Sequence, residues 1–298
     1  MQTLQYFVVD VFTETPLQGN PLAVVMNTCG LSSAQMQAVA REFNLSETTF
    51  VERRPAQIER MQGVRVRIFT TQEELNFAGH PTLGTATVLK LHAPETVNEG
   101  VVLLALNVGA IPVRFAAEGL YGEMTQRDPE FGDELDSDMM ARIAGLTVDE
   151  LHAALSPQVV STGTPFAIAV LRDVETLSRI KVDHESAAAQ LRAHGAELLY
   201  VLAPDGVPGE GLVSQWRARM QFYGGEDPAT GSAAGCAISY LVQRGAVPGG
   251  RRIHLRQGVE IGRTSDLFLS ANLAAPRVTD VRVAGSTVSV ATGQLFLP

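Results

Sequence analysis

The sequence predicts an α+β fold of two pseudo-symmetric halves, each a mixed, mostly antiparallel sheet wrapped around one buried central helix. Two observations lead to this prediction. Runs of strand-like residues surround two segments that are apolar or small on every side, and a helix of that composition is normally buried all round. The two segments also repeat each other about half a chain apart, which indicates a duplicated half.

The repeat is visible residue by residue. One segment reads His80-Pro81-Thr82-Leu83-Gly84-Thr85-Ala86, and 147 positions later the chain reads Asp227-Pro228-Ala229-Thr230-Gly231-Ser232-Ala233. Proline, glycine and alanine coincide, and a threonine lies opposite a serine. The first residue of each segment differs, and both are titratable, so we expect one distinct polar residue at the start of each buried helix.

The second segment is the clearer helix. It lies within 224–244 and has no charged residue from Pro228 to Gln243. Asp227 followed by Pro228 is typical of a helix N-terminus, because a carboxylate can cap it and a proline costs nothing at the first position. Gly245 is typical of the residue after a helix. We therefore expect Asp227 to be the N-cap of this helix.

The first half is expected to consist mainly of strands around one helix. A capping box of Ser32 and Gln35 predicts a helix that ends near Asn44, and the strand Thr48–Val51 follows directly after Glu47. A buried helix is expected over 81–91. Further strands are expected at 4–12, 22–26, 64–70, 101–107, 111–116 and 120–126.

The second half is expected to begin at 127, and the acidic segment 128–138 is expected to be the surface crossover between the halves. Two short helices follow it, the second opened by a capping box of Thr147 and Glu150. A hairpin turn is expected at Gly285-Ser286. Helices are expected at 174–180 and 184–194, and strands at 158–161, 166–171, 197–203, 212–222, 252–256, 259–262, 266–270, 277–283, 286–291 and 294–297. The domains are thus predicted to be 1–126, joined by the last strand at about 286–298, and 127–285, with the active site between them.

Composition excludes several classes of protein. The 298 residues are 45% hydrophobic and 18% charged, with a net charge of −9, so we expect no nucleic-acid partner. The longest aliphatic run, Val101–Leu106, is too short to cross a membrane. Cys236 lies in the expected buried helix, which argues against a disulfide with Cys29 and favours a reducing compartment. We expect a cytoplasmic protein without a signal peptide.

The duplicated helices predict a site for an anion. Helix N-termini favour negative charge. A carboxylate is the natural ligand group for two helix N-termini that are directed at one site. Gly84 and Gly231 would let the ligand approach the backbone, while Thr85 and Ser232 would add hydroxyl donors. The titratable groups expected around this site are Glu47, His80 and Asp227. A glutamate that loses its solvation in an apolar site can both take and return a proton.

Each of these residues also has a simpler structural interpretation. Asp227 before a proline can be an ordinary helix cap, and Glu47 can be a solvated loop carboxylate. His80 is a poor cap, so a structural role explains it less well. The remaining histidines have no cysteine or carboxylate at ligand spacing, which argues against a metal site. The chain also has neither the nucleotide-binding glycine motifs nor the G-x-S-x-G of serine hydrolases.

Five motifs in order resemble the phenazine-biosynthesis PhzF-like family, over almost the whole chain. They are Gly19-Asn20-Pro21-Leu22-Ala23-Val24-Val25, Asn44-Leu45-Ser46-Glu47-Thr48-Thr49-Phe50-Val51, Phe77-Ala78-Gly79-His80-Pro81-Thr82-Leu83-Gly84-Thr85-Ala86, Glu226-Asp227-Pro228-Ala229-Thr230-Gly231-Ser232-Ala233-Ala234-Gly235 and Gln257-Gly258-Val259-Glu260-Ile261-Gly262-Arg263. The resemblance implies the diaminopimelate-epimerase-like fold and a cofactor-free isomerase, often a homodimer, that moves a proton on a small cyclic carboxylic acid.

The same resemblance implies roles for individual residues. Glu47 would be the acid/base, His80, Asp227 and Ser232 would assist it, and Asn20, Gly79 and Gly231 would bind the substrate. The epimerase branch has cysteines at positions 80 and 227, and their absence here excludes a two-thiol mechanism. The segment 221–225 is shorter than in the family, which leaves the substrate open. Two alternatives therefore remain: a carboxylate-based amino-acid racemase or epimerase, and a non-catalytic carboxylate-binding protein.

Overall fold

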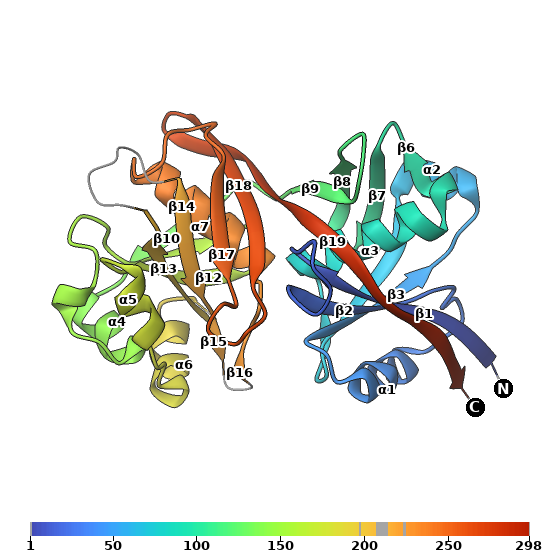
Figure 1. Ribbon diagram of the computed structural model, residues 1–298, viewed down its shortest axis with the longest axis horizontal. Coiled ribbons are helices and arrows are strands. Elements are labelled where there is room, and N and C mark those ends of the chain that lie inside the picture. The colour runs from blue at the N-terminus through green and yellow to red at the C-terminus, as the bar shows by residue number, and fades with distance from the viewer. Residues whose placement is uncertain (1, 197, 207–213, 223–224, 298) are drawn as a thin grey trace. The chain divides into compact units, whose positions relative to one another are not determined.

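A computed structural model describes residues 2–196, 198–206, 214–222 and 225–297 of the chain. Within them the chain divides into two compact units (Figure 1). The first contains residues 1–125 together with 284–298, and the second contains residues 126–283. Both units combine sheets with helices, so the α+β class is confirmed.

The first unit is built on a mixed sheet. Its neighbouring strands are antiparallel except for two parallel pairs, β2 with β3 and β4 with β7. The last strand, β19 (Arg277–Leu297), pairs with β1 and also with β9, which closes the sheet into a barrel. The other strands are β1 (Gln2–Val11), β2 (Asn20–Val25), β3 (Glu47–Glu52), β4 (Val64–Phe69), β5 (Glu74–Leu75), β6 (Val97–Asn98), β7 (Val101–Leu106), β8 (Gly109–Phe115) and β9 (Tyr121–Thr125).

Helix α3 (Gly79–His92) is packed against this sheet, and every residue from Gly79 to Leu89 is buried. Gly84 brings the helix close to β1 and β2. A Cβ atom on Gly84 would lie 2.7 Å from Leu22 Cδ2 and 2.8 Å from Val11 Cγ2, well inside van der Waals contact. The expected role of Gly84 in admitting a ligand is therefore wrong, since the glycine is needed for packing of the helix on the strands.

Helix α1 (Ser33–Phe43) follows the sequence prediction closely. Ser32 and Gln35 form the expected capping box, and Asn44 ends the helix in the left-handed conformation. Its face of Met36, Val39 and Ala40 packs in a core with Phe50 and Phe69, among others. By contrast, the short helix α2 (Ala56–Gln62) was not predicted; its buried Glu59 forms an ion pair with Arg53, which lies just before the helix.

The second unit is also built on a mixed sheet, in which β12 with β13 and β14 with β17 are the parallel pairs. Its strands are β10 (Glu130–Glu134), β11 (Gln158–Ser161), β12 (Pro165–Val170), β13 (Leu198–Pro204), β14 (Gln215–Arg219), β17 (Ile253–Gln257), β18 (Ser265–Ala274) and the first part of β19. A separate hairpin joins β15 (Gln221–Phe222) to β16 (Gly225–Glu226). The turn of the shortened segment 221–225, at residues 223 and 224, lies outside the described residues.

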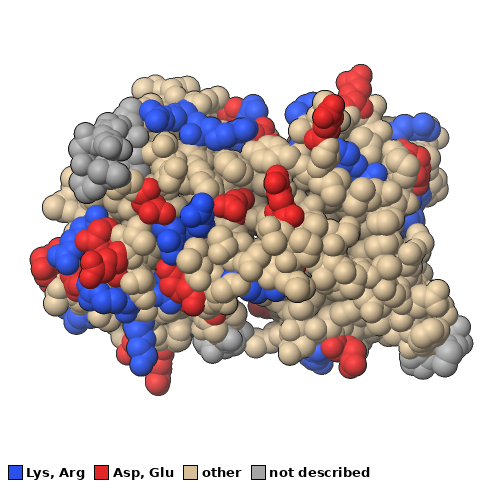
Figure 2. All heavy atoms as spheres, in the orientation of Figure 1, with Lys and Arg blue, Asp and Glu red and all other residues tan. Residues whose placement is uncertain are grey.

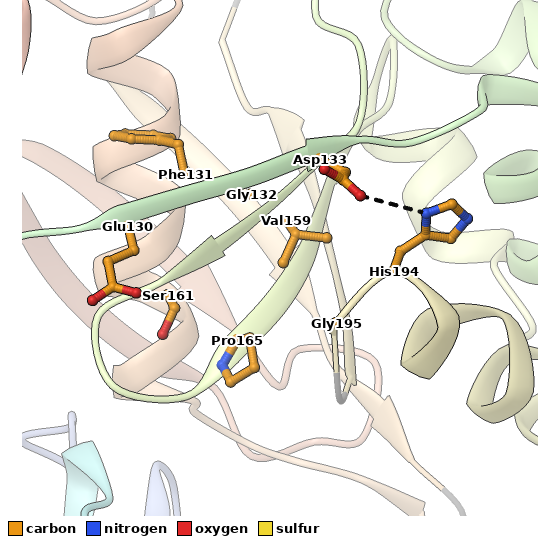
Figure 3. A pocket seen from close by; sticks show the side chains of 9 residues that line it. All are labelled: Glu130, Phe131, Gly132, Asp133, Val159, Ser161, Pro165, His194 and Gly195. Carbon is orange, nitrogen blue, oxygen red and sulfur yellow. Dashed lines mark ion pairs between the residues drawn. The ribbon is translucent and has the colours of Figure 1, made fainter.

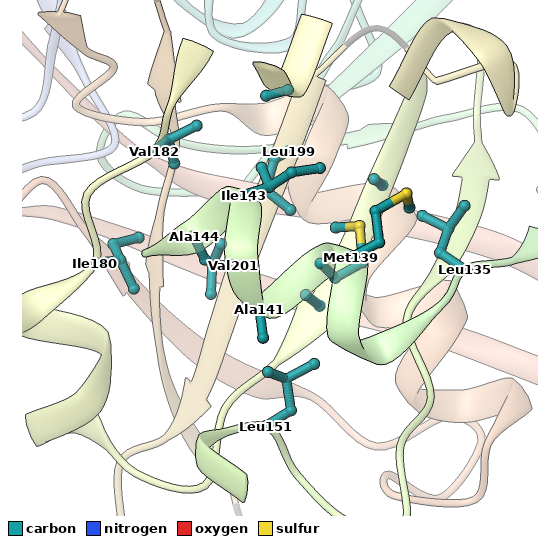
Figure 4. Close-up of a cluster of buried hydrophobic side chains, with 14 of the residues drawn as sticks. Leu135, Met139, Ala141, Ile143, Ala144, Leu151, Ile180, Val182, Leu199 and Val201 are labelled. Carbon is teal, nitrogen blue, oxygen red and sulfur yellow. The ribbon is translucent and has the colours of Figure 1, made fainter. Parts of the chain in front are cut away.

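Strand β13 shows how this unit uses both faces of its sheet. Leu199 and Val201 point into a cluster formed with the helices on one face (Figure 4), while Tyr200 and Leu202 are equally buried on the other face. A strand with both faces buried is apolar along its whole length. The helices of that cluster are α4 (Ser137–Ala144), α5 (Val174–Arg179) and α6 (His184–Ala193).

Helix α7 (Gly231–Gln243) packs against β18, β11 and β12. All of its residues except Ser232 and Gln243 are buried, as the absence of charge in this segment predicts, and Gly245 follows it with a positive φ. The predicted start was wrong. Thr230, three residues after Asp227, is the N-cap, and Pro228 lies in the preceding loop rather than in the first turn.

Three other predictions for the second half were wrong. Residues 128–138 contain the strand β10, which is held by pairing with β11 and not by its acidic composition. Residues 259–262 form a turn between β17 and β18, closed by hydrogen bonds from Gly262 N to Val259 O and from Arg263 N to Gly258 O. Gly285-Ser286 is no hairpin: β19 continues through it, because Thr287 at once pairs with Val11 of β1.

Charged side chains of both signs are interspersed on the face of the second unit shown in Figure 2. Ion pairs of this unit include Arg179 with Glu150 and Arg172 with Asp173. Among the described residues, no helix is both long and apolar enough to cross a membrane.

Candidate active site

Glu47 is placed by the strand pairing of the first unit. It is the first residue of β3, directly after the turn that follows α1, and it lies opposite Leu22 in the parallel pair of β2 and β3. Its side chain is 16% exposed. A carboxylate that is mostly withdrawn from water, yet not sealed off, can reach both the protein interior and a bound ligand.

His80 and Asn20 lie beside Glu47. His80 is the second residue of α3, and Asn20 is the first residue of β2; both are buried. The Asn20 side-chain nitrogen lies 3.2 Å from His80 Nδ1, and His80 Nε2 lies 3.4 Å from Glu47 Oε2. Three residues that are distant in sequence thus form one row of polar groups, Asn20–His80–Glu47.

The protonation of His80 follows from its neighbours. The Asn20 amide nitrogen can only donate, so His80 Nδ1 accepts and the ring proton lies on Nε2, facing Glu47. Burial lowers the pKa of His80 from 6.5 to about 3, because the charged ring would lose its hydration. His80 is therefore neutral at pH 7, and its contact with Glu47 is not an ion pair.

The distance between these two groups fits that conclusion. At 3.4 Å, the His80–Glu47 contact is longer than the ~2.7–3.2 Å of an ordinary N–H···O hydrogen bond. A charged imidazolium held against a carboxylate would be drawn closer. The neutral ring can instead donate its Nε2 proton toward a carboxylate that approaches in the correct geometry, and this lets it orient Glu47 without titrating itself.

The second group of predicted residues lies in the second unit, around the start of α7. Asp227 is half-buried in the loop before the helix, and its Oδ2 accepts a hydrogen bond of 2.6 Å from the Thr230 hydroxyl. Gly231 and Ser232 are the first two residues of α7. Asp227 caps no helix, which contradicts its structural interpretation as an N-cap and leaves its carboxylate held by a side chain instead.

The start of α3 and the start of α7 share one property. Neither N-cap residue, Ala78 nor Thr230, makes a side-chain hydrogen bond to its own helix. The first-turn N–H groups of a helix, which include those of Gly79 and Ser232 here, are the groups that such a cap normally satisfies. Uncapped first turns are suited to bind a carboxylate.

The hydroxyl donors expected in these turns differ. Thr85 is fully buried, and its Oγ1 lies 2.8 Å from the Thr49 hydroxyl, so it stabilises the contact between α3 and β3 and does not face a ligand. Ser232 is partly exposed in the first turn of α7. The threonine and serine that coincide in the sequence repeat therefore occupy different environments.

Two buried glutamines near α7 were not predicted to act at the site. Gln257 hydrogen-bonds the Asp227 carbonyl and Thr230, and Gln126 donates to the Gly231 carbonyl at 2.8 Å. Gln257 is the first residue of one of the sequence motifs, which was the available signal. Its contacts depend on β17 ending beside the loop at 227–230, and the sequence alone does not show this.

The surface hollow of Figure 3 does not coincide with these residues. It is formed by β10, β11 and the end of α6, and within it His194 Nδ1 lies 4.0 Å from Asp133 Oδ2. No predicted site residue lines it. Its lining residues are Glu130, Phe131, Gly132, Asp133, Val159, Ser161, Pro165, His194 and Gly195.

The free thiols and potential metal ligands bear on the alternatives. Burial raises the pKa of the Cys236 thiol to about 12, so it remains protonated and inert as a base. Among the described residues, no group of three or more His, Cys, Asp and Glu side chains could hold a metal ion.

Comparison with known proteins identifies the family. The model of the family described as phenazine biosynthesis-like protein (PhzC-PhzF) matches residues 9–293. The chain belongs to the phenazine biosynthesis-like family. The trans-2,3-dihydro-3-hydroxyanthranilate isomerase of Pseudomonas aeruginosa is 38% identical over 303 residues, covering 98% of this chain and 99% of that enzyme. The chain is accordingly an isomerase, which rules out the non-catalytic alternative.

Solved structures agree with the phenazine biosynthesis-like family. The PhzF-family protein of Bacillus anthracis has a TM-score of 0.85 at 23% identity and covers all of both chains. A predicted epimerase from Pseudomonas aeruginosa has a TM-score of 0.82 at 33% identity, covering 99% of this chain and all of the other. The mixed α+β fold of this chain is therefore that of the family.

Proposed function

We propose that this protein is a cofactor-independent isomerase that moves a proton on a small, cyclic carboxylic acid, with Glu47 as its acid/base. The supporting observation is the row Asn20–His80–Glu47, in which a neutral histidine faces a partly exposed carboxylate. Glu47 takes a proton from one carbon and returns it to another. Because Nε2 of the neutral His80 carries a proton, His80 orients the carboxylate throughout.

Substrate binding is assigned to the uncapped helix starts. The substrate carboxylate would accept hydrogen bonds from first-turn N–H groups at Gly79 and Gly231, which are worth ~0.3–1 kcal/mol per helix end and more when partly buried. The Ser232 hydroxyl would add a donor and Asn20 a contact to the substrate. Asp227 would assist the proton transfer, because its carboxylate is oriented by Thr230 and remains half-buried.

The substrate class is supported by relatives named trans-2,3-dihydro-3-hydroxyanthranilate isomerase. The experiment is a solvent-deuterium screen of the purified protein with this dihydroaromatic acid and with a panel of α-amino acids, followed by ¹H NMR. The proposal predicts a shift of the double bonds in the ring of the dihydroaromatic acid. Exchange at the α-carbon of an amino acid, with no conversion of the cyclic acid, would instead establish the racemase.

We also propose that the protein is a homodimer. Light scattering of the protein eluted from a size-exclusion column measures its mass directly, and twice the 31.9 kDa of one chain is expected. A mass of one chain across the micromolar range would contradict this part of the proposal and would leave the proposed chemistry intact.

A further inference from the structure

The motif Gln257–Arg263 has so far no role in the proposed chemistry. Gln257 ends β17 and is fully buried between neighbouring strands, opposite Ser265 of β18. A buried side-chain amide is costly unless its donors and acceptor are all satisfied. The partners of this amide therefore show what the residue is for.

All of those partners lie around the loop that holds Asp227, except for one tyrosine. Gln257 Nε2 donates to the Asp227 carbonyl at 2.8 Å and to the Thr230 hydroxyl at 3.0 Å. Gln257 Oε1 accepts from the Thr230 backbone N–H at 3.2 Å and from the Tyr200 hydroxyl at 2.7 Å. One amide thus fixes both ends of the four-residue loop before α7.

The direction of these hydrogen bonds determines what Thr230 does. An amide –NH₂ group can only donate, so the Thr230 oxygen accepts from Gln257 and its own proton points elsewhere. That proton is donated to Asp227 Oδ2, 2.6 Å away. Burial raises the pKa of Tyr200 well above 10, so its hydroxyl remains a donor at the other end of the chain.

The position of Thr230 makes this arrangement unusual. A threonine at an N-cap normally turns its hydroxyl to the N–H groups of the first helical turn. Thr230 is the N-cap of α7, yet its side chain makes no such bond. Its hydroxyl is used for the Asp227 carboxylate instead, and this leaves the first turn of α7 uncapped.

The rest of the motif contacts the backbone of the same loop or takes part in ion pairs next to it. Gly258 has a φ of +76°, and a Cβ atom there would overlap Arg263 O and lie 2.7 Å from Pro228 O. Glu260 pairs with Arg217 at 2.7 Å, and Arg219 holds Glu226, the residue before Asp227, through contacts of 2.9 and 2.6 Å. The loop is therefore fixed on its backbone and at its ends, and only the Asp227 side chain extends from it.

We propose that Gln257 and Thr230 are positioning residues, which orient the Asp227 carboxylate and at the same time release the first turn of α7 for the substrate. This inference rests on the proposed role of Asp227. The chain of donors runs from Tyr200 through Gln257 and Thr230 to Asp227, so each member acts through the next, and only Asp227 meets the substrate.

The test replaces Thr230 with valine, which has the same shape and no hydroxyl. Loss of the donor disfavours the charged form of Asp227, so the acid limb of the kcat/KM profile moves to higher pH. We expect kcat to fall by up to ~100-fold from misorientation of the carboxylate. Thr230→Ser, which keeps the hydroxyl, restores both the rate and the pH profile.

A matched control is available in the same unit. Thr176 is fully buried in α5, where it lies against Asp173, to which its backbone N–H donates at 2.7 Å. Thr176→Val removes an equivalent group without touching the loop, so we expect neither kcat nor the pH profile to change. If Thr230→Val does not fold, Thr230→Ala removes the same hydroxyl with less steric demand and serves as the test.

A second measurement separates this inference from the proposed function. ¹³C NMR of protein labelled at aspartate carboxyl groups follows Asp227 directly, without any assay of activity. The Asp227 titration should move to higher pH in Thr230→Val and return in Thr230→Ser. If it stays in place in both variants, the positioning role is wrong. If it moves while Asp227→Asn is fully active, positioning holds and the catalytic role of Asp227 fails.

Discussion

The two groups of candidate residues are held in opposite ways. In the first unit, Glu47 faces a neutral histidine across 3.4 Å, and that histidine is fixed by one hydrogen bond from Asn20. In the second unit, Asp227 is held at 2.6 Å by a hydroxyl that is itself part of a fully connected buried network. The first carboxylate thus lies beside a neutral ring that is itself held by a side chain, and the second accepts from a hydroxyl that the buried network fixes.

This difference has its origin in where the helices start. His80 lies inside the first turn of α3, whereas its counterpart in the sequence repeat, Asp227, precedes the N-cap of α7 by three residues. The same offset that aligns proline, glycine and alanine therefore places one polar residue on a helix and the other in a loop. Sequence equivalence within a repeat does not imply structural equivalence of the polar positions.

Among substitutions in the second group of candidate residues, the largest expected effect is the loss of activity in Asp227→Asn. Asp227→Asn keeps the hydrogen bond from Thr230 but removes the charge, and loss of a positioned acid/base costs roughly 10²–10⁴-fold in rate. Steady-state kinetics with the dihydroaromatic acid measure it. The control is Asp138→Asn, at an exposed position of α4. Equal loss in both variants, or none in Asp227→Asn, contradicts the proposed role.

The helices α3 and α7 differ in what surrounds their buried glycines. A Cβ on Gly235 of α7 would overlap the Gln126 side-chain amide, which holds the Gly231 carbonyl, whereas Gly84 of α3 meets only aliphatic side chains. Each glycine-to-alanine change overpacks the core and should cost about 1–3 kcal/mol of the free energy of unfolding. Gly235→Ala should also lower kcat, because it displaces the first turn of α7.

Urea unfolding and steady-state kinetics on both variants test this contrast. Gly84→Ala should lose stability and keep more of its kcat than Gly235→Ala, since the groups it would meet are aliphatic side chains of β1 and β2 and none of them hydrogen-bonds a first helical turn. A loss of kcat in Gly84→Ala that equals the loss in Gly235→Ala would show that the first turn of α7 has no special sensitivity.

The smallest expected effect is on the pH dependence of stability, and it concerns His80 in the first group of candidate residues. The pKa of His80 lies near 3 in the folded protein and near 6.5 when the ring is exposed, so the unfolded state binds this proton more tightly. Stability therefore falls as pH drops from about 6.5 toward 3, by about 2 kcal/mol between pH 7 and pH 5 for this one group. His80→Asn should remove this part of the slope.

Urea unfolding at both pH values provides the measurement for His80. The control, His92→Asn, lies at the exposed end of the same helix and should keep the slope of the unsubstituted protein. An unchanged slope in His80→Asn would mean that the ring takes up its proton over the same pH range in the folded and the unfolded protein, and the neutral state assigned to His80 would be wrong.

Much of the fold could be predicted because it follows from sequence patterns of neighbouring residues. The capping box at Ser32, the uncharged run of α7 and the alternation of β4 each depend on residues close in sequence. The errors fall where distant partners decide. The strand β19 continues through Gly285 because β1 pairs with it, and residues 259–262 form a turn because β17 and β18 pair on either side of them.

The candidate site divides in the same way. The sequence motifs identified the residue types, and their roles were inferred by resemblance. The tautomer of His80 depends on Asn20, which lies 60 residues away, and the direction of the Asp227 hydrogen bond depends on Gln257, 30 residues further along the chain. Hydrogen-bond direction is a property of the assembled network, so no pattern of spacing could have predicted it.

The central claim is that Glu47 transfers the proton, and its most direct test compares two glutamates of one strand. Glu47 begins β3, and Glu52 ends it beside Arg65, at 4.0 Å. Both are changed to glutamine, folding is checked by circular dichroism, and kcat/KM is measured with the dihydroaromatic acid. The account predicts a loss of about 10²-fold or more in Glu47→Gln and near-full activity in Glu52→Gln. Full activity in a folded Glu47→Gln variant would contradict it.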